Sequence, residues 1–176
     1  MSTIIAPAQA GTWQADPIHS SIGFAVKHNG IATFKGEFGE FAATLADGKL
    51  AGAAQVTSVR VDDETLNGHL LSPDFFDAER YPEIRFESTE LRVDEGRFVV
   101  DGELELKGVR KPVQLVGEFG GPVTDAYGNE RIGVTLETSI DRTDFGVSWN
   151  MELPGGGALV ENEVKLTAEL ELVKEA

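Results

Sequence analysis

The residues with the most obvious capacity for chemistry are the adjacent His19 and Ser20. A histidine can act as the general base that activates a serine nucleophile when the two side chains lie within hydrogen-bonding reach. The residues that follow alternate between apolar and polar, which predicts a strand, and neighbouring strand residues point to opposite faces. We therefore expect no catalysis from this pair. The prediction for His19 is a structural ring, hydrogen-bonded to Asp16 or to a loop carbonyl.

The three histidines of the chain, His19, His28 and His69, could together with carboxylates hold a zinc ion. Zinc sites usually show short motifs such as H-x-H or H-E-x-x-H, and neither occurs here. The sequence therefore predicts no metal site and no cofactor. His28 shares a strand face with Phe24, so His28 and likewise His69 are candidate contacts for the polar head of a ligand.

A third candidate is Arg142, in the segment DRTDFG at residues 141–146, where opposite charges surround an aromatic residue. One interpretation is a structural loop in which the guanidinium binds carboxylates or backbone carbonyls. The other is that Arg142 helps to hold the phosphate or carboxylate head of a ligand. Most acidic residues occupy alternating positions on the solvent faces of the predicted strands, so no acid–base pair can be singled out. No catalytic residue is predicted.

Alternation of apolar and polar residues continues from Gly11 to the end of the chain and predicts strands with one solvated face. Hairpin turn signals separate the strands, for example at Asn29-Gly30 and Asp47-Gly48. A bulge is expected near Gly39-Glu40 and a break at Gly120-Gly121-Pro122. We predict an all-β fold with about eight strands in a single antiparallel up-and-down barrel. A two-sheet sandwich is the alternative architecture.

The alternation is interrupted by a short helical segment predicted around residues 63–78, and again by a non-regular stretch at residues 141–157. Asp62 and Asp63 could cap its first turn, and Phe75 and Phe76 follow. One interpretation is a helical plug or lid packed against the mouth of the barrel. The other is a long loop pinned to the core by its aromatic residues.

Small residues share the inner strand faces with the apolar ones, at Gly36, Gly52, Ala54, Gly102 and Gly117. They predict a tube-like void through the barrel, unless the glycines only mark bends. A lining of aliphatic and phenylalanine side chains would select a long apolar ligand, since burial contributes about 0.8 kcal/mol per CH₂. The residues predicted to bind it are Phe24, Val26, Phe34, Phe38, Phe75, Phe76, Phe86, Phe98, Leu104, Leu136 and Trp149.

Length and charge restrict the class of protein. A chain of 176 residues suits one domain, here predicted over residues 11–176 after a flexible segment at residues 1–10. The net charge of −15 repels nucleic acid and anionic lipid, so a nucleic-acid partner is not expected. There is no cysteine, no apolar run long enough for a membrane span and no basic leader, which together predict a cytoplasmic protein.

Five motifs in order resemble the YceI-like family of polyisoprenoid-binding proteins with a lipocalin-like barrel. They are D-P-x-H-S-x-x-x-F-x-V-x-H at residues 16–28, F-x-G-x-F at 34–38, G-H-L-x-S-x-D-F-F-D-x-x-x-Y-P-x-I-x-F at 68–86, G-x-L-x-L-x-G-V-x-K-P-V at 102–113 and D-R-x-D-F-G at 141–146. The resemblance implies that an isoprenoid or another extended amphiphile threads the barrel, that the helix near Phe75 and Phe76 closes one side, and that two chains pair as a homodimer. Many members carry Arg-Asp where this chain has Leu66-Asn67, so a polar contact made by those charges is not expected here.

We therefore predict that the chain binds or carries a polyisoprenoid or fatty-acid-like lipid without catalysis. Two alternatives remain open at this point. The first is an enzyme acting on an apolar substrate in the same pocket, with His28, His69 or Arg142 as the polar agent. The second is a ligand-free stress or interaction protein with a solidly packed barrel.

Overall fold

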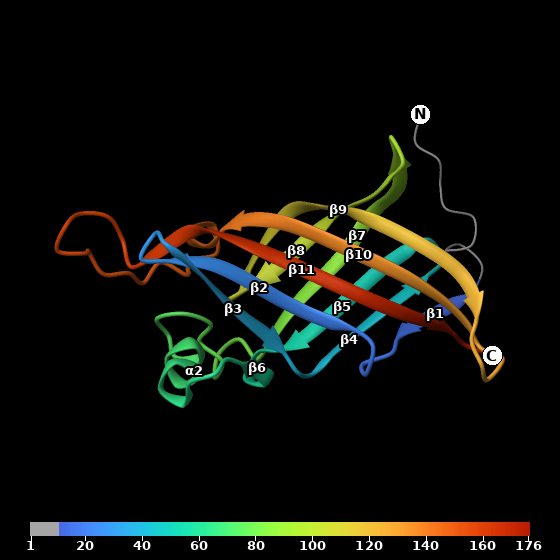
Figure 1. Cartoon of the computed structure of the whole chain (residues 1–176), viewed down its shortest axis with the longest axis horizontal. Coiled ribbons are helices and arrows are strands. Elements are labelled where there is room, and N and C mark those ends of the chain that lie inside the picture. Colours follow the sequence, from blue (N-terminus) through green and yellow to red (C-terminus); the bar gives the residue numbers. More distant parts are fainter. Residues whose placement is uncertain (1–10) are drawn as a thin grey trace.

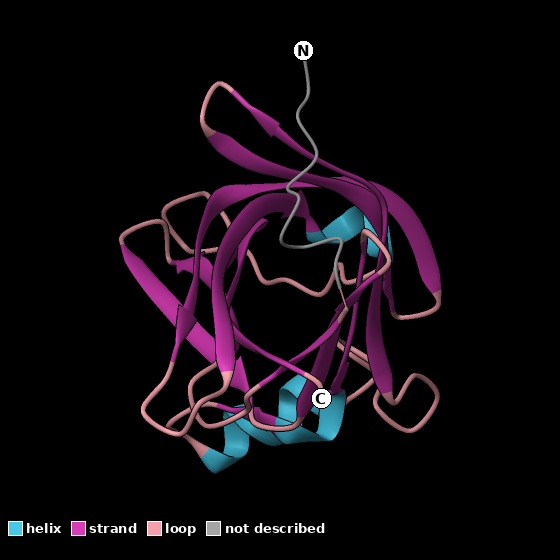
Figure 2. Cartoon of the chain, turned by 90° about the vertical axis from the view of Figure 1, so that its right-hand side faces the viewer, coloured by secondary structure: helices cyan, strands magenta, loops and turns pink. Residues whose placement is uncertain are grey.

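The computed structural model describes residues 11–176, and the predicted flexible segment at residues 1–10 lies outside this range. Its strands form one antiparallel sheet that closes on itself, because β1 pairs with both β4 and β11. In Figure 1 the helix α2 (Glu64–Leu71) lies at the opposite end of the long axis from the C-terminus. Figure 2, viewed along that axis, shows the strands as a ring. The strands of the described part are β1 (Thr12–Ala15), β2 (Ser21–His28), β3 (Ala32–Phe38), β4 (Phe41–Ala46), β5 (Lys49–Gln55), β6 (Val59–Arg60), β7 (Glu83–Asp94), β8 (Arg97–Leu106), β9 (Val109–Thr124), β10 (Glu130–Asp141) and β11 (Val160–Lys174).

The eight strands of the predicted barrel are confirmed over the described residues, although three of them are interrupted. β1 and β2 are two parts of one strand, as are β3 and β4, and β5 and β6 are separated by a 3-10 turn at Val56–Ser58. The break between β3 and β4 falls at Gly39 and Glu40, where a bulge was predicted. Sequential hairpins then connect neighbours all the way round, which is the up-and-down topology.

Tight turns set the register of these hairpins. Four of them place two consecutive residues at positive φ, with glycine second, as the central pair of a type I′ turn requires. Three of these loops have two residues, and the β2–β3 loop has Ile31 in addition, since His28 pairs with Ala32. The pattern N-G or D-G is recognisable at two of the turns, and the other two use Glu and Lys in the first position. These turns are Asn29-Gly30, Asp47-Gly48, Glu95-Gly96 and Lys107-Gly108.

The expected break at Gly120-Gly121-Pro122 is wrong. β9 continues through it to Thr124, and the pairing with β10 shifts register between Arg131 and Gly133. A bulge at this point absorbs the proline, which has no N–H to give to the ladder, so the strand bends instead of ending.

The helix α2 (Glu64–Leu71) begins with the predicted cap, since the Asp63 side chain accepts a hydrogen bond from the Leu66 N–H at 2.9 Å. It is shorter than predicted. Ser72 is extended (φ −74°, ψ 168°) because it precedes Pro73, and a residue before proline is disfavoured in the helical region. The chain continues to Asp77 in tight turns. The helix and these turns, residues 64–77, are called the plug segment below.

Two clusters of buried side chains divide the interior. The first fills the barrel at the end of β1, and its most deeply buried members are Leu45, Phe98, Val100, Ile132, Val134, Leu136 and Leu172. The second lies at the end of α2 and combines strand residues with Leu70 and Phe75 of the plug segment. The space for a ligand lies in this second half.

Candidate functional site

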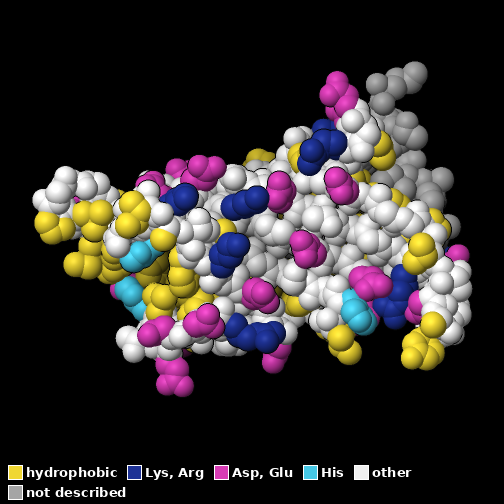
Figure 3. All heavy atoms as spheres, viewed as in Figure 1, with side chains coloured by type: hydrophobic (Ala, Val, Ile, Leu, Met, Phe, Trp, Pro, Cys, Tyr) yellow, Lys and Arg dark blue, Asp and Glu magenta, His cyan; other side chains and the backbone are white. Residues whose placement is uncertain are grey.

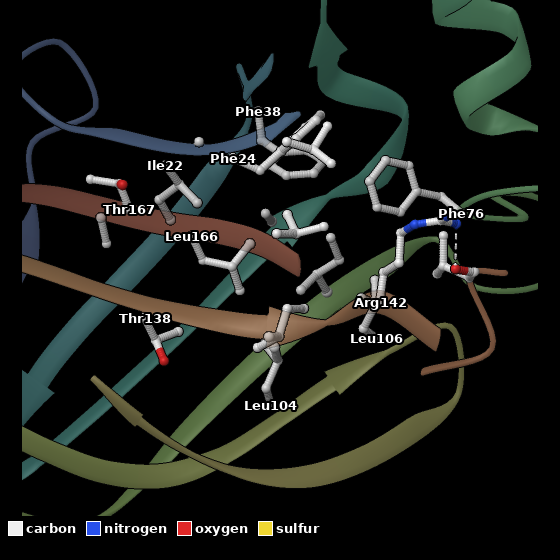
Figure 4. A pocket seen from close by; sticks show the side chains of 18 of the residues that line it. Ile22, Phe24, Phe38, Phe76, Leu104, Leu106, Thr138, Arg142, Leu166 and Thr167 are labelled. Carbon is white, nitrogen blue, oxygen red and sulfur yellow. Dashed lines mark hydrogen bonds between the residues drawn. The ribbon is translucent and has the colours of Figure 1, made fainter. Parts of the chain in front are cut away.

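A cavity of about 600 Å³ occupies the half of the barrel next to the plug segment. Its walls are overwhelmingly apolar and come from the plug segment and from strands all round the barrel, β2 to β5 and β7 to β11. In Figure 4 the side chains of Phe24, Leu104 and Leu166 surround the central space from three different strands. A volume of this size, with few polar groups, falls in the range of small-molecule binding sites.

The cavity is closed at its inner end, so the expectation of a void running through the whole barrel is wrong. Ala43, Leu50, Leu136 and Leu170 belong both to the cavity wall and to the first core cluster, and they form the floor. Beyond this floor the large ring of Trp13, only 2% exposed, packs with the other members of that cluster. The barrel is filled on one side of the floor and hollow on the other.

The small inward residues contribute less space than predicted. Of the five, only Gly52 and Ala54 line the cavity. A Cβ on Gly36 would collide with the ring of Phe24, and one on Gly102 with the ring of Phe86. At Gly117 the backbone of Thr135 occupies the place of a side chain. Three of the glycines therefore let a neighbouring ring or strand approach closely, and only Gly52 and Ala54 leave space to the cavity.

The predicted lining residues come together with one exception. Phe98 lies in the filled half, where its ring packs against Phe119 with centroids 5.6 Å apart. It is in phase with the inner face of β8, but at the wrong end of the strand. All the others line the cavity: Phe24, Val26, Phe34, Phe38, Phe75, Phe76, Phe86, Leu104, Leu136 and Trp149.

Aromatic contacts hold the plug segment on the end of the barrel. Phe76 packs edge-on against Phe24 and Phe38, with centroids 6.2 and 5.8 Å away. The His69 ring packs between Phe75 and Trp149 at 4.9 and 4.6 Å. The plug interpretation and the pinned-loop interpretation thus each describe part of the segment, which is a short helix followed by turns that carry the aromatic anchors.

A lysine adds a polar link to these contacts. Lys107, in the β8–β9 turn, donates from Nζ to the Pro73 carbonyl at 2.7 Å and to the Gly146 carbonyl at 3.3 Å. The first carbonyl belongs to the plug segment, and the second follows the 3-10 turn at Arg142–Phe145. One ammonium group therefore joins the plug segment to the rim of the barrel.

The mouth of the cavity lies beside the β2–β3 turn, where the lining residues Lys27, His28, Ala32 and Thr33 are exposed. Figure 3 shows hydrophobic side chains gathered on the surface at this end, with histidine beside them. His69 also lines the cavity, and its Nε2 lies 3.0 Å from the Asp74 carboxylate. The two histidines predicted as head-group contacts are therefore both at the open end.

Arg142 is 4% exposed and lines the same cavity. Its guanidinium donates to three backbone carbonyls, those of Val147 at 2.7 Å, Glu161 at 3.0 Å and Val160 at 3.4 Å. The structural interpretation with carbonyl acceptors describes these bonds. Burial lowers the pKa of the Arg142 guanidinium from its ordinary value, but an arginine stays charged at neutral pH. In Figure 4 its side chain reaches toward the ring of Phe76.

His19 is structural, as predicted. Its Nδ1 lies 2.7 Å from Asp16, whereas the Ser20 hydroxyl bonds the backbone N–H of Glu171 at 3.0 Å. The partner that sequence reasoning missed is Arg131, which donates to Asp16 at 2.9 Å and to Asp125 at 2.7 Å. We call His19, Asp16, Arg131 and Asp125 the corner network, since it ties the corner between β1 and β2 to β10.

Sequence reasoning also missed several apolar lining residues. Those on strands, for example on β10 and β11, lie on the inward face that the alternation predicts, so the sequence did carry a signal for them. Those on the plug segment and the loop before β11 had no periodic signal. The missed residues include Ile22, Leu66, Leu70, Ile84, Leu106, Ile140, Val147, Leu159, Val164 and Leu166.

Other classes of site find no support in the part of the chain that the structure describes. Within residues 11–176, no group of three or more His, Asp or Glu side chains is placed to hold a metal ion. None of the helices in that range is long and apolar enough to span a membrane.

Comparison with solved structures agrees with the barrel. BcnA of Burkholderia cenocepacia superposes with a TM-score of 0.74 at 22% identity, over 89% of this chain and 98% of that one. A YceI protein of Campylobacter jejuni gives 0.70 at 27% identity, over 85% and 90%. A domain of Saccharophagus degradans, described as polyisoprenoid-binding, gives 0.69 at 15% identity, over 93% and 98%.

Relatives found by sequence have a higher identity to this chain than these solved structures do. A UPF0312 protein of Vibrio parahaemolyticus is 35% identical over 151 residues, which cover 80% of this chain and 79% of the relative. A UPF0312 protein of Photorhabdus laumondii is 34% identical, covering 72% and 70%. The family model of the YceI-like domain matches residues 13–172, almost the whole described range. The chain belongs to the YceI-like family.

Proposed function

We propose that this protein binds and carries a long, narrow amphiphile, a polyisoprenoid or a fatty-acid-like lipid, without transforming it. The observation that supports this most directly is the cavity of about 600 Å³ with an apolar wall, closed at one end and open beside the plug segment. The polyisoprenoid-binding description of the Saccharophagus degradans domain supports the same class of ligand.

The dimensions of the cavity suit a chain. Along β11 its lining runs from Leu170 to Val160, roughly 33 Å of strand at about 3.3 Å per residue. With the usual strand tilt near 40°, this corresponds to roughly 25 Å along the barrel axis. At about 0.8 kcal/mol per buried CH₂, ten methylenes supply about 8 kcal/mol gross, the free energy of a micromolar complex before ordering costs.

The direct test is extraction of ligand from protein purified from its own host, followed by native mass spectrometry and lipid analysis. We expect a hydrophobic molecule in near one-to-one ratio with the chain. A clean mass of the unliganded polypeptide, together with failure to take up any long-chain lipid in vitro, would contradict the carrier function.

An enzyme acting in the same cavity is the second candidate, because the His69 ring faces the lining and pairs with Asp74. A histidine oriented by a carboxylate can serve as a general base. This candidate requires consumption of the bound lipid by wild-type protein and its loss in His69→Ala. Recovery of the lipid unchanged after prolonged incubation supports the carrier. The cytoplasmic location and the homodimer remain predictions, which fractionation and light scattering would check.

A further inference from the structure

The charge of the cavity wall is opposite in sign to that of the whole molecule. The chain has 30 acidic and 15 basic residues, for a net charge of −15. Among the described residues that line the cavity there is no aspartate or glutamate. Of the basic ones, Lys27 and Arg85 are exposed on the outer strand face, where Arg85 bonds Glu83, so Arg142 is the residue that brings a positive charge to the cavity. A random sample of this sequence would bring two acids for each base. An anionic group in the cavity thus meets no carboxylate of the wall and one buried cation.

Arg142 is the one basic residue of this wall that is buried, while Lys27 and Arg85 are exposed. A guanidinium has five N–H donors, and the three carbonyl bonds of Arg142 leave two of them without a protein acceptor. No carboxylate of the described residues forms an ion pair with it. The nearest acid in sequence, Asp141, accepts hydrogen bonds from the N–H and hydroxyl of Thr143 at 2.9 and 2.6 Å, and it acts on Arg142 only through space.

A buried cation without a carboxylate in contact is costly, because carbonyl dipoles replace only part of its hydration. An anionic group brought in by a ligand would recover that cost and form charge-assisted hydrogen bonds with the free N–H groups. Arg142 contacts the carbonyls of Val147 and Val160, which belong to the mouth end of the cavity, far along β11 from the floor residue Leu170. The position fits a polar head near the mouth with its chain directed to the floor.

We propose that the amphiphile carries an acidic head, a carboxylate or a phosphate monoester, which lies against Arg142 beside Phe76. This inference rests on the proposed carrier function and specifies which members of the lipid class bind best. Neutral alcohols and amides with the same chain bind more weakly, since they leave the cation uncompensated.

The test uses wild-type protein and ligands that differ only in the head. One series is hexadecanoate, hexadecyl phosphate and hexadecanol, and a prenyl series is geranylgeranyl phosphate and geranylgeraniol. Binding is followed by the fluorescence of Trp149, which lines the cavity, and by calorimetry. We expect an acidic member to bind at least tenfold more tightly than its alcohol, and the carboxylate and phosphate members distinguish the two heads.

Equal affinities for acid and alcohol in both series would overturn the acidic head while leaving the carrier function intact. If neither series binds, the carrier function itself fails. These outcomes need no variant, so they hold even if substitution of Arg142 disturbs folding.

A variant then assigns the effect to one residue. In Arg142→Gln the affinities for acid and alcohol converge to within about threefold, with folding checked by circular dichroism. The matched control is Arg97→Gln, at an exposed position where β8 begins, which keeps the wild-type preference. A folded Arg142→Gln protein that still prefers the acid by tenfold would refute the assignment to Arg142.

Discussion

The ring of Phe24 lies directly over Gly36, its partner across the β2–β3 ladder, and occupies the place where a Cβ would stand. Phe24 in turn contacts Phe76 of the plug segment. The absence of a side chain at Gly36 therefore determines how one aromatic wall of the cavity is oriented, and through it how the plug segment is seated.

Gly36→Ala should displace this ring. We expect a loss of about 1–3 kcal/mol in the free energy of unfolding, the usual cost of overpacking, together with weaker lipid binding because Phe24 is turned into the cavity. Urea denaturation and a lipid titration measure the two effects. Gly133→Ala is the matched control, because a Cβ there has no neighbour within 4 Å. Equal stability of the two variants would show that Phe24 does not depend on Gly36.

Two inward glycines should respond differently to leucine. Gly52 lines the cavity, and a Cβ there has Ala42 O at 3.3 Å as its nearest neighbour, whereas one on Gly102 would meet the Phe86 ring and the Glu87 backbone. Gly52→Leu is expected to fold and to lose its lipid, because the new side chain fills the cavity. Gly102→Leu is expected to lose about 3 kcal/mol or more. Thermal melts and lipid retention after purification distinguish them, and a Gly52→Leu protein that retains lipid would contradict the position of the ligand.

Lys107 should control how fast lipid exchanges. Lys107→Gln removes the ammonium that bonds the Pro73 and Gly146 carbonyls, so the plug segment opens more easily. A loss of about 1.4 kcal/mol corresponds to a tenfold change, and we expect lipid release to accelerate severalfold, up to about that limit. Stopped-flow transfer to an acceptor vesicle measures the rate. Lys111→Gln, on the exposed face of β9, is the control, and equal release rates would exclude a gating role for the plug segment.

Acid should weaken the corner network. Hydrogen bonds from His19 and Arg131 hold the pKa of Asp16 well below its ordinary value, and bonds from Arg131 and the Asn129 N–H do the same for the pKa of Asp125. Because these pKa values are lowered by folding, the stabilisation is complete above the unfolded value near 3.9 and is lost as the pH falls below it. Urea midpoints measured from pH 6 to pH 2 should drop less steeply in Asp125→Asn than in wild type. Asp47→Asn, at an exposed turn, should keep the wild-type slope.

His19 should act in the opposite direction. Its hydrogen bond to Asp16 raises the pKa of the imidazole above 6.5, so its contribution is present below that pH and is lost as the pH rises through the raised value. The effect is small because the ring is 60% exposed. Stability measured between pH 6 and pH 9 should decline slightly in wild type and stay level in His19→Gln. A decline of the same size in the variant would assign it to another group.

Much of the barrel was predictable because period-two alternation and glycine turns are local signals. Val164, Leu166 and Leu170 on β11 fall on the inner face as their parity indicates. The position along a strand is not local, which is why Phe98 was placed at the cavity although it packs against Phe119 in the filled half. The alternation of residues along a strand shows which face a side chain occupies. Its position along the barrel axis depends on the tilt and stagger of the strands in the closed sheet.

The interior volume was harder to predict for a related reason. A neighbouring phenylalanine ring fills the space beside Gly36 and beside Gly102, so an estimate from residue size alone gives too large a cavity. Cross-strand register decides whether a ring covers a glycine, and register follows from the whole set of turns. The corner network escaped notice because Arg131 is 115 residues from Asp16 in the sequence.

The layer formed by Leu50, Leu136 and Leu170 separates the packed core of the barrel from its cavity. On the side of this layer away from the cavity, tightly packed side chains of the first core cluster hold the strands together. The fold therefore has its own core apart from the cavity. For the carrier proposed above, this means that binding and release of a lipid can alternate without unfolding of the barrel.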